Sequence, residues 1–249
     1  MPPVPGNSAR PADAAVANDY DSFAEAYSAE NESSLLNAYY ERPAMLALAG
    51  DVAGRRILDA GCGSGPLFAA LRDRGAIVTG FDKSAAMVEL ARRRLGDGAD
   101  LRVADVGSPL PFPNGEFDDV IASLVLHYLE DWGPALAELR RVLKPGGRLL
   151  VSVEHPFVIT LMHVQAGREA SYFATSNRTE EYSFSGQSAL LSLWDRPLHA
   201  MTGAFTAAGF RMTAISEPEP APAARELFPD QLAGKPRFLA FLFFVLERG

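Results

Sequence analysis

From Arg55 onwards, short apolar runs alternate with stretches whose apolar positions recur every three or four residues. This rhythm predicts strands followed by helices, the arrangement of a largely parallel sheet covered by helices. A Pro-Gly-Gly sequence at 145–147 ends one predicted helix, and Ser84 is a favourable N-cap for another. The predicted strands are 56–60, 76–81, 101–104, 117–124, 148–153, 210–215 and 238–246, and the predicted helices are 67–74, 85–95, 132–143 and 197–208.

The segment before the first predicted strand has a different pattern. Residues 1–18 are rich in Pro, Ala and Asn without hydrophobic periodicity, which predicts a disordered tail. Residues 19–54 are predicted to form helices, with a break at Pro43. Aromatic side chains at helical spacing could form a lid over a bound cation or hold the first helix in place. These aromatic residues are Tyr20, Phe23 and Tyr27.

The alternation of strands and helices lapses again at about 155–196, a stretch rich in aromatic residues. We interpret this stretch as an insertion into a domain that otherwise runs from 55 to 249. The chain length of 249 residues fits one such domain with additions at one side.

Acidic residues outnumber basic ones by 31 to 23, which gives a formal net charge of −8. A general nucleic-acid-binding role is disfavoured, because phosphate backbones require a cationic surface. The single cysteine cannot form an internal disulfide and the four scattered histidines lack zinc-ligand spacing, so we expect a reduced protein without a metal. No stretch resembles a secretory signal or reaches the ~20 apolar residues of a membrane span, so we expect cytoplasmic residence.

The stretch 58–65, which reads Leu-Asp-Ala-Gly-Cys-Gly-Ser-Gly, lies where the first predicted strand meets the first helix. Glycines allow the backbone to turn sharply and approach a ligand, and free amides at a helix start favour polar or anionic groups. A dinucleotide-binding loop needs a third glycine where this chain has Pro66. A cofactor other than a dinucleotide is therefore expected here, and a purely structural glycine turn is the alternative.

The chain resembles the class I S-adenosylmethionine-dependent methyltransferases in four elements that occur in the same order. The loop 58–65 matches the first motif of that family, and 80–84 matches the acidic end of its second strand. Further matches are 104–106 at the third strand, and 117–118 with 143–147 at the fourth strand and the turn into the fifth. The resemblance implies a Rossmann-like α/β fold. Its seven-stranded, mostly parallel sheet would have the order 3-2-1-4-5-7-6, with the last strand antiparallel.

Within the family, the stretch 111–118 is most similar to the small-molecule group, methyltransferase type 11, which includes ubiquinone and menaquinone biosynthesis enzymes. The resemblance implies S-adenosyl-L-methionine as cofactor, S-adenosyl-L-homocysteine as product and a small-molecule acceptor. Residues 19–54 and 155–196 would then close over the substrate, and their aromatic content suits a neutral, partly apolar molecule. The resemblance leaves open whether oxygen, nitrogen or carbon is methylated.

The cofactor-binding residues of the family carry over position by position. Asp82 would accept hydrogen bonds from both ribose hydroxyls, although an acid here could simply favour the start of the next helix. Asp105 would accept from the adenine amino group beside the Val106 amide, and Met87 would pack on the ring or merely in the core. Asp59 would meet the ammonium group through water. The expected set is Tyr27, Asp59, Ala60, Gly61, Cys62, Gly63, Gly65, Asp82, Lys83, Met87, Asp105, Val106 and Ser123.

Catalysis requires little of the protein beyond positioning, since a sulfonium leaving group is already activated. If the acceptor must lose a proton, a histidine is the natural base. His127 follows the fourth predicted strand and His155 the fifth, at the edge where open α/β sheets bind ligands, so both are candidate catalytic residues. Packing is the alternative for both, and we interpret Cys62 as a packing residue because no His or Asp partner is placed beside it.

Two further classes of function stay open at this point. A non-catalytic protein that binds S-adenosylmethionine or S-adenosylhomocysteine would carry the same motifs. A closed aromatic pocket would favour an enzyme, whereas an exposed apolar face would favour a partner surface. An oxidoreductase with a nicotinamide cofactor is the third class, which Pro66 disfavours.

Overall fold

The computed structural model describes residues 16–168, 171–234 and 237–249, and most of the predicted tail, 1–15, lies outside them. Its strands follow the predicted ones within a few residues at most ends. The strands of the main sheet are β1 (Arg56–Ala60), β2 (Ile77–Asp82), β3 (Asp100–Val103), β4 (Phe117–Ser123), β5 (Leu143–Glu154), β8 (Phe210–Ser216) and β9 (Phe241–Arg248).

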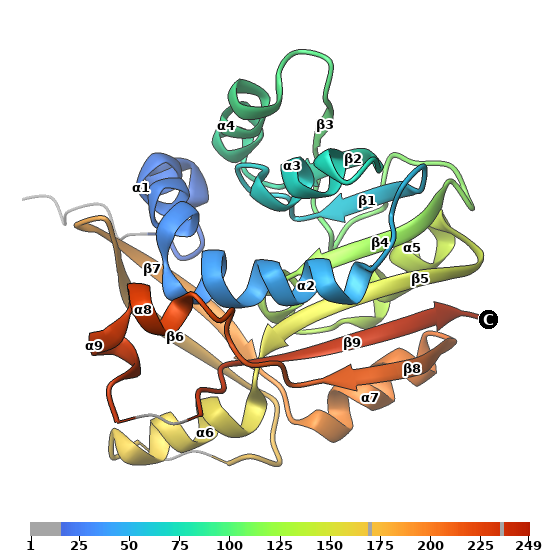
Figure 1. The fold of residues 1–249 in the computed structure, drawn as a ribbon. Helices are drawn as coiled ribbons and strands as arrows, with labels where there is room; N and C mark the ends of the chain where they lie inside the picture. Colours follow the sequence, from blue (N-terminus) through green and yellow to red (C-terminus); the bar gives the residue numbers. More distant parts are fainter. Residues whose placement is uncertain (1–15, 169–170, 235–236) are drawn as a thin grey trace, which may run out of the picture.

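Seven strands form this sheet in the order β3-β2-β1-β4-β5-β9-β8 (Figure 1). Neighbours from β3 to β5 pair in parallel, whereas the last strand, β9, runs antiparallel to both β5 and β8. The predicted α/β fold and strand order 3-2-1-4-5-7-6 are therefore confirmed. The order reverses between β1 and β4, and open α/β sheets bind ligands at such a reversal, beyond the carboxyl ends of the strands.

Helices cover both faces of the sheet. They are α2 (Arg42–Ala49), α3 (Pro66–Asp73), α4 (Ala85–Leu95), α5 (Gly133–Val142) and α7 (Leu198–Ala207), with the short α8 (Ala224–Leu227) and α9 (Pro229–Leu232) at one end. Successive strand residues point to opposite sides, so Leu58 and Val120 pack with α5 and α7 while Ile57 and Ile121 pack with α2 and α3. The central strands are thus buried on both sides, as expected of a parallel sheet.

Local signals explain most element ends. The Ser84 hydroxyl accepts the Met87 amide at 3.0 Å, which confirms Ser84 as the N-cap of α4. β5 begins at Leu143, earlier than predicted, because Leu143 pairs with Phe117 of β4 across an irregularity that accommodates the Pro-Gly-Gly turn. β9 begins later than predicted, since Phe238 packs beside the helices around Leu35 instead of joining the sheet.

Pro43 does not break the second N-terminal helix, so that prediction was wrong. The chain stays helical through a π-helix, η1 (Asn37–Glu41), into α2, whose first turn contains Pro43. In a regular helix the Tyr39 carbonyl would bond to the amide that proline lacks. Here the Tyr39 carbonyl accepts the Ala221 amide at 2.7 Å, so no hydrogen bond is lost and the proline is tolerated.

The insertion contains helix α6 (Pro156–Gln165) and a hairpin of β6 (Ser176–Phe184) and β7 (Gln187–Asp195), which forms a separate two-stranded antiparallel sheet. Figure 1 shows this hairpin beside α1 (Tyr20–Ser33). Phe23 of α1 is buried against apolar side chains of β7, including Leu191. The hairpin and the first helix therefore share one apolar cluster.

Asn18 adds a polar link between these two segments. Its side-chain amide donates to the Ser192 carbonyl at 2.9 Å, and its side-chain oxygen accepts the Ser192 amide at 2.9 Å. Asn18 thus pairs with β7 as a neighbouring strand would. The last residue of the predicted tail is held in place by this pairing.

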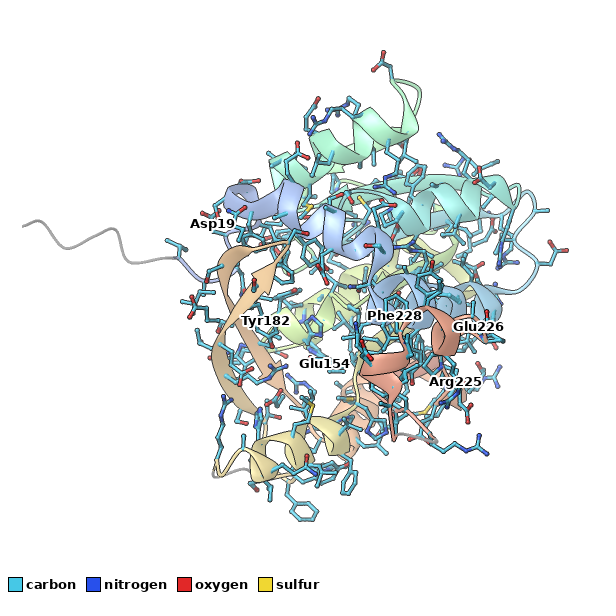
Figure 2. All side chains as sticks on the ribbon, turned by 60° about the vertical axis from the view of Figure 1, so that its left-hand side comes forward. Asp19, Glu154, Tyr182, Arg225, Glu226 and Phe228 are labelled. Carbon is cyan, nitrogen blue, oxygen red and sulfur yellow. The ribbon has the colours of Figure 1, made fainter. Side chains whose placement is uncertain are left out.

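Arg178 fastens the hairpin to the main sheet. Its side chain is 9% exposed and donates to Asp195 at 2.9 Å and to Tyr182 at 2.6 Å within the hairpin. It also pairs with Glu154 at the end of β5. Figure 2 shows Glu154 and Tyr182 close together on this side of the molecule. A buried arginine surrounded by carboxylates thus fixes the position of the hairpin relative to β5.

Candidate functional site

A cavity of about 720 Å³ lies beyond the carboxyl ends of β1, β2 and β4, where the strand order reverses. Residues of α1 and η1, from Tyr20 to Glu41, cover its other side. Figure 2 shows Asp19, another wall residue, at the start of α1. The cavity therefore occupies the position at which this class of sheet binds ligands.

The glycine loop after β1 requires glycine for two separate reasons. Gly61 has a φ of 74°, and a Cβ on it would lie 2.7 Å from the Val125 side chain. Gly63 also has a positive φ, 54°, but its missing Cβ would meet no atom within 4 Å. The amides of Gly61 and Cys62 both donate to the Phe81 carbonyl of β2 at 2.9 Å. The loop is thus tied to β2 and presents bare backbone to the cavity.

Asp82 ends β2 and organises the loop beside it. One carboxylate oxygen accepts the Gly63 amide at 2.9 Å and the other accepts the Ser84 amide at 2.9 Å. Burial raises the pKa of Asp82, although these backbone hydrogen bonds act in the opposite direction. Each oxygen retains a further lone pair for a ligand hydroxyl. Asp82 is therefore both a helix-start acid and a potential ribose acceptor, the two roles considered from the sequence.

The expected adenine contacts lie together at the ends of β2 and β3. Asp105 pairs with Lys83 at 2.9 Å and accepts the Gly107 amide at 2.9 Å. Burial acts to raise the pKa of Asp105, but these two partners hold it below its usual value. Met87 and Val106 line the same part of the cavity and are almost fully buried. This end of the cavity combines an apolar surface, which suits a purine ring, with a carboxylate acceptor, which suits its amino group.

Asp59 is buried in the cavity wall without a full set of partners. Asp59 belongs to β1, lines the cavity and is 1% exposed. Within the described chain, its Oδ2 atom has no hydrogen-bond partner. Burial, followed by the negative charges of Glu41 and Asp82, raises the pKa of Asp59 to about 7. An acceptor of this kind on a cavity fits a cationic group of a ligand.

The structure brings most of the expected cofactor-binding residues to this cavity. Two of them lie behind the wall. Ala60 is the fully buried last residue of β1, and Gly65 directly precedes α3, where a Cβ would lie 3.0 Å from the Leu95 side chain of α4. The expected residues on the wall are Tyr27, Asp59, Gly61, Cys62, Gly63, Asp82, Lys83, Met87, Asp105, Val106 and Ser123.

The aromatic face of α1 is divided between packing against the hairpin and lining the cavity. Phe23 stacks on Phe184 of the hairpin with ring centroids 5.6 Å apart and holds the helix in place. Tyr20 and Tyr27 face the cavity, and the Tyr20 hydroxyl bonds to the Tyr128 hydroxyl, also on the wall. The phenol side chains of Tyr20, Tyr27 and Tyr128 thus cover part of the cavity.

Neither candidate catalytic histidine lies on this wall. His127 is buried beside a separate cavity of about 20 Å³, and burial lowers its pKa to about 3, so the ring is neutral. His155 precedes α6, and its Nε2 atom lies 2.7 Å from a Glu217 carboxylate oxygen. Both histidines follow strand ends at the expected edge of the sheet. The hairpin covers His127, however, and His155 contacts Glu217, so neither side chain lines the cavity. Their catalytic role stays a prediction.

Sequence reasoning missed four charged residues on the wall, Asp19, Asp21, Glu41 and Arg42, of which the last two are adjacent where η1 meets α2. Glu41 is 4% exposed, and its Oε1 atom accepts the hydroxyls of Ser123 and Ser152, both at 2.7 Å. Burial raises the pKa of Glu41. Arg42 donates to the carbonyl and side-chain oxygens of Asn31 at 2.9 and 2.7 Å. The signal available in the sequence was the pair of adjacent charged residues, Glu41 and Arg42, inside the largely apolar stretch 35–49.

Helix α6 carries the exposed apolar surface that would favour a partner. Its exposed side chains are Phe157, Leu161, Met162 and Val164. In the described residues, no helix has the length and apolar character of a membrane span, and no group of three or more His, Cys, Asp or Glu side chains is arranged to hold a metal.

Comparisons with known proteins agree with this site. A family model described as "Methyltransferase domain" matches residues 58–151. The demethylmenaquinone methyltransferase of Tropheryma whipplei is 35% identical over 140 residues, which cover 55% of this chain and 58% of that protein. The ubiquinone/menaquinone biosynthesis C-methyltransferase of Desulfotalea psychrophila is 36% identical over 158 residues, covering 55% and 63%. The matches thus span about three fifths of the length of these curated relatives.

A solved structure extends the likeness over most of the chain. An S-adenosylmethionine-dependent methyltransferase from Mesorhizobium loti is 26% identical with a TM-score of 0.64, covering 83% of this chain and 96% of that one. The chain is therefore similar to class I S-adenosylmethionine-dependent methyltransferases, in sequence over its central part and in fold over most of its length. S-adenosylmethionine is the cofactor of that family, as the four sequence motifs predicted.

Proposed function

We propose that the protein transfers a methyl group from S-adenosylmethionine to a small-molecule acceptor by in-line displacement. One observation carries this proposal: the glycine loop, two strand-end carboxylates and a group of phenol rings meet on a single cavity of about 720 Å³. Relatives named for demethylmenaquinone and for ubiquinone/menaquinone biosynthesis support a small, partly apolar acceptor.

The residues present fit the cofactor on chemical grounds. Asp82 would accept hydrogen bonds from the ribose hydroxyls, and Asp105 would accept one from the adenine amino group above Met87. The unpartnered oxygen of Asp59 would receive the ammonium group, directly or through water. When bound, S-adenosylmethionine supplies an electrophilic methyl group on a charged sulfur.

The contribution of the chain to the reaction is positioning and exclusion of water. Tyr20, Tyr27 and Tyr128 border the cavity, where aromatic faces favour a neighbouring cation. Residues 19–54 and the insertion 155–196 would together close over the acceptor. Holding two reactants in line can supply ~7–11 kcal/mol of the barrier, so no general base is required for an acceptor that is already nucleophilic.

A non-catalytic protein that binds S-adenosylmethionine is the second candidate. The exposed apolar side chains of α6 favour it, because such a surface on a soluble domain is often a contact for a partner. The phenol-lined cavity favours the enzyme.

Calorimetric titration with S-adenosylmethionine, S-adenosylhomocysteine and NAD tests the cofactor assignment. We expect micromolar binding of the first two and none of NAD. Incubation with methyl-labelled S-adenosylmethionine and demethylmenaquinone analogues, followed by extraction of labelled product, then separates the two candidates. Transfer supports the enzyme, whereas binding without transfer to any acceptor in a broad screen supports the non-catalytic protein. Binding of NAD alone would contradict both.

A further inference from the structure

Glu41 is a buried carboxyl group on the cavity wall that forms no salt bridge with a described side chain, although the charge of neighbouring Arg42 acts on it from a distance. Its Oε1 atom is fixed by Ser123 at the end of β4 and Ser152 of β5, two residues that face each other in the sheet register. Two hydroxyl donors hold a carboxylate in position but do not neutralise its charge. Neighbouring Arg42 directs its guanidinium to Asn31 instead.

The backbone around Glu41 is irregular on both sides. Glu41 is the last residue of the π-helix η1, a rare conformation that is frequent at functional sites. Leu124, which follows Ser123 and lines the cavity, has a φ of 49°, and its amide donates to the Ser152 hydroxyl at 3.1 Å. A left-handed conformation is strained for leucine, and such strain is concentrated at ligand sites. The irregular backbone thus builds a specific position for this carboxyl group.

Asp59 is a second buried carboxyl group on the same cavity, and its Oδ2 atom has no partner in the described structure. Asp59 belongs to β1 and Glu41 contacts the end of β4, so the two groups flank the point where the strand order reverses. Buried charges without partners are unfavourable. Positive charge from a ligand would therefore stabilise the ionised form of this pair.

We propose that Glu41 recognises the sulfonium charge of S-adenosylmethionine and makes the cavity prefer the cofactor over its demethylated product. This inference rests on the proposed function. S-adenosylmethionine has two cationic centres, the ammonium and the sulfonium groups, whereas S-adenosylhomocysteine has only the ammonium group. Two carboxyl groups match two cations. After the methyl group has left, Glu41 is again without a counter-charge, which weakens binding of the product and favours its release.

Calorimetric titration of the wild type and Glu41→Gln with both ligands tests the inference without a known acceptor. Glutamine keeps the shape of the side chain and can still accept from both serines. We expect Glu41→Gln to weaken S-adenosylmethionine binding at least tenfold and S-adenosylhomocysteine binding by no more than twofold. The matched control is Glu25→Gln on α1, where the side chain is 75% exposed and pairs with Arg93. This control should change neither affinity by more than twofold.

Equal weakening of both ligands would overturn the inference, because Glu41 would then contact a group that both share. Unchanged binding of both would overturn it as well. If Glu41→Gln does not fold, as judged by circular dichroism, Ser152→Ala provides the test. It removes one of the two hydroxyls that hold Glu41, and we expect the preference for S-adenosylmethionine to fall two- to threefold, whereas an unchanged preference contradicts the inference. A wild type that binds neither ligand contradicts the proposed function itself.

Discussion

The amide of Gly63 donates to the Asp82 carboxylate at 2.9 Å, so the residue that ends β2 fixes the glycine loop that follows β1. The same carboxylate accepts the amide of Ser84 at the start of α4. One side chain therefore joins the loop, a strand end and a helix start at the edge of the cavity. Changes at Asp82 should disturb the shape of the loop as well as any ribose contact.

We expect Asp82→Ala to weaken S-adenosylmethionine binding at least tenfold. The variant loses the expected acceptor for two ribose hydroxyls, and it also leaves the Gly63 and Ser84 amides without their partner. Calorimetric titration measures the effect, with Asp97→Ala on the exposed turn after α4 as the control. An unchanged affinity would refute the ribose assignment.

Binding of S-adenosylmethionine should tighten as the pH rises through about 7. Burial, with the charges of Glu41 and Asp82, raises the pKa of Asp59 to about 7, and a cationic ligand binds the ionised carboxylate better than the neutral acid. Calorimetry between about pH 5.5 and 8.5 in buffers of equal ionic strength measures this trend. In Asp59→Asn the rise centred near pH 7 should disappear, and its persistence would assign the titration to another group.

The same carboxyl group should make the ligand-free protein less stable as the pH rises from about 4 to about 7. The folded protein keeps a proton on Asp59 in this window, whereas the unfolded chain, with an ordinary pKa of ~3.9, has lost it, so the unfolding free energy falls and then levels off. Asp59→Asn should increase the unfolding free energy at pH 8 by about 1–3 kcal/mol. Urea denaturation at pH 5 and pH 8 provides the comparison, and a loss of stability at pH 8 would count against an unpaired buried charge.

Alanine should be tolerated unequally at two glycines of the same loop. Gly61→Ala combines a left-handed φ with a Cβ 2.7 Å from Val125, whereas Gly63→Ala has the left-handed φ alone. The φ strain costs ~1–2 kcal/mol in each case, and the contact adds to it only at Gly61. Thermal and urea unfolding of the two variants should rank Gly61→Ala as the less stable. The reverse order would show that the loop can move away from Val125.

Loss of the Arg178 side chain should destabilise the protein by about 3 kcal/mol, because it leaves three half-buried carboxylates without their partner. The side chain is 9% exposed and pairs with Glu154, Glu180 and Asp195. Arg168→Ala is the control, since Arg168 is 55% exposed and surface pairs contribute ~0–1 kcal/mol. Urea denaturation of Arg178→Ala and Arg168→Ala measures both. Equal effects would mean that the hairpin is held by its apolar contacts.

The sequence was most informative where one residue pattern has one structural solution. Alternating runs predicted the strands, whereas their order was implied by the resemblance to the methyltransferase family. The Ser84 cap and the glycine loop were located because each depends on neighbouring residues. Pro43 was misjudged because the donor that makes its helix possible, Ala221, is distant in sequence. Glu41 was missed for the same reason, since its serine partners belong to β4 and β5. Contacts between distant segments have no local signature.

The two histidines show a further limit of pattern reasoning. A strand-end position predicts the correct edge of the sheet for His127 and His155, but the direction of each side chain depends on what covers it. The hairpin, which is part of the insertion, covers His127 and places Asp195 beside it. The reversal of strand order thus predicts where the cavity lies, whereas the identity of the side chains that line it could be seen only in the structure.

Helix α1, which covers part of the cavity, is held by the hairpin, a segment that is distant from it in the sequence. Asn18 pairs with Ser192 although 174 positions separate them, and Phe23 stacks on Phe184. Neither segment can swing outward while the other stays in place. Entry and exit of ligands then depend on one concerted opening, so fluorescent reporters attached to α1 and to the hairpin should record the same rate.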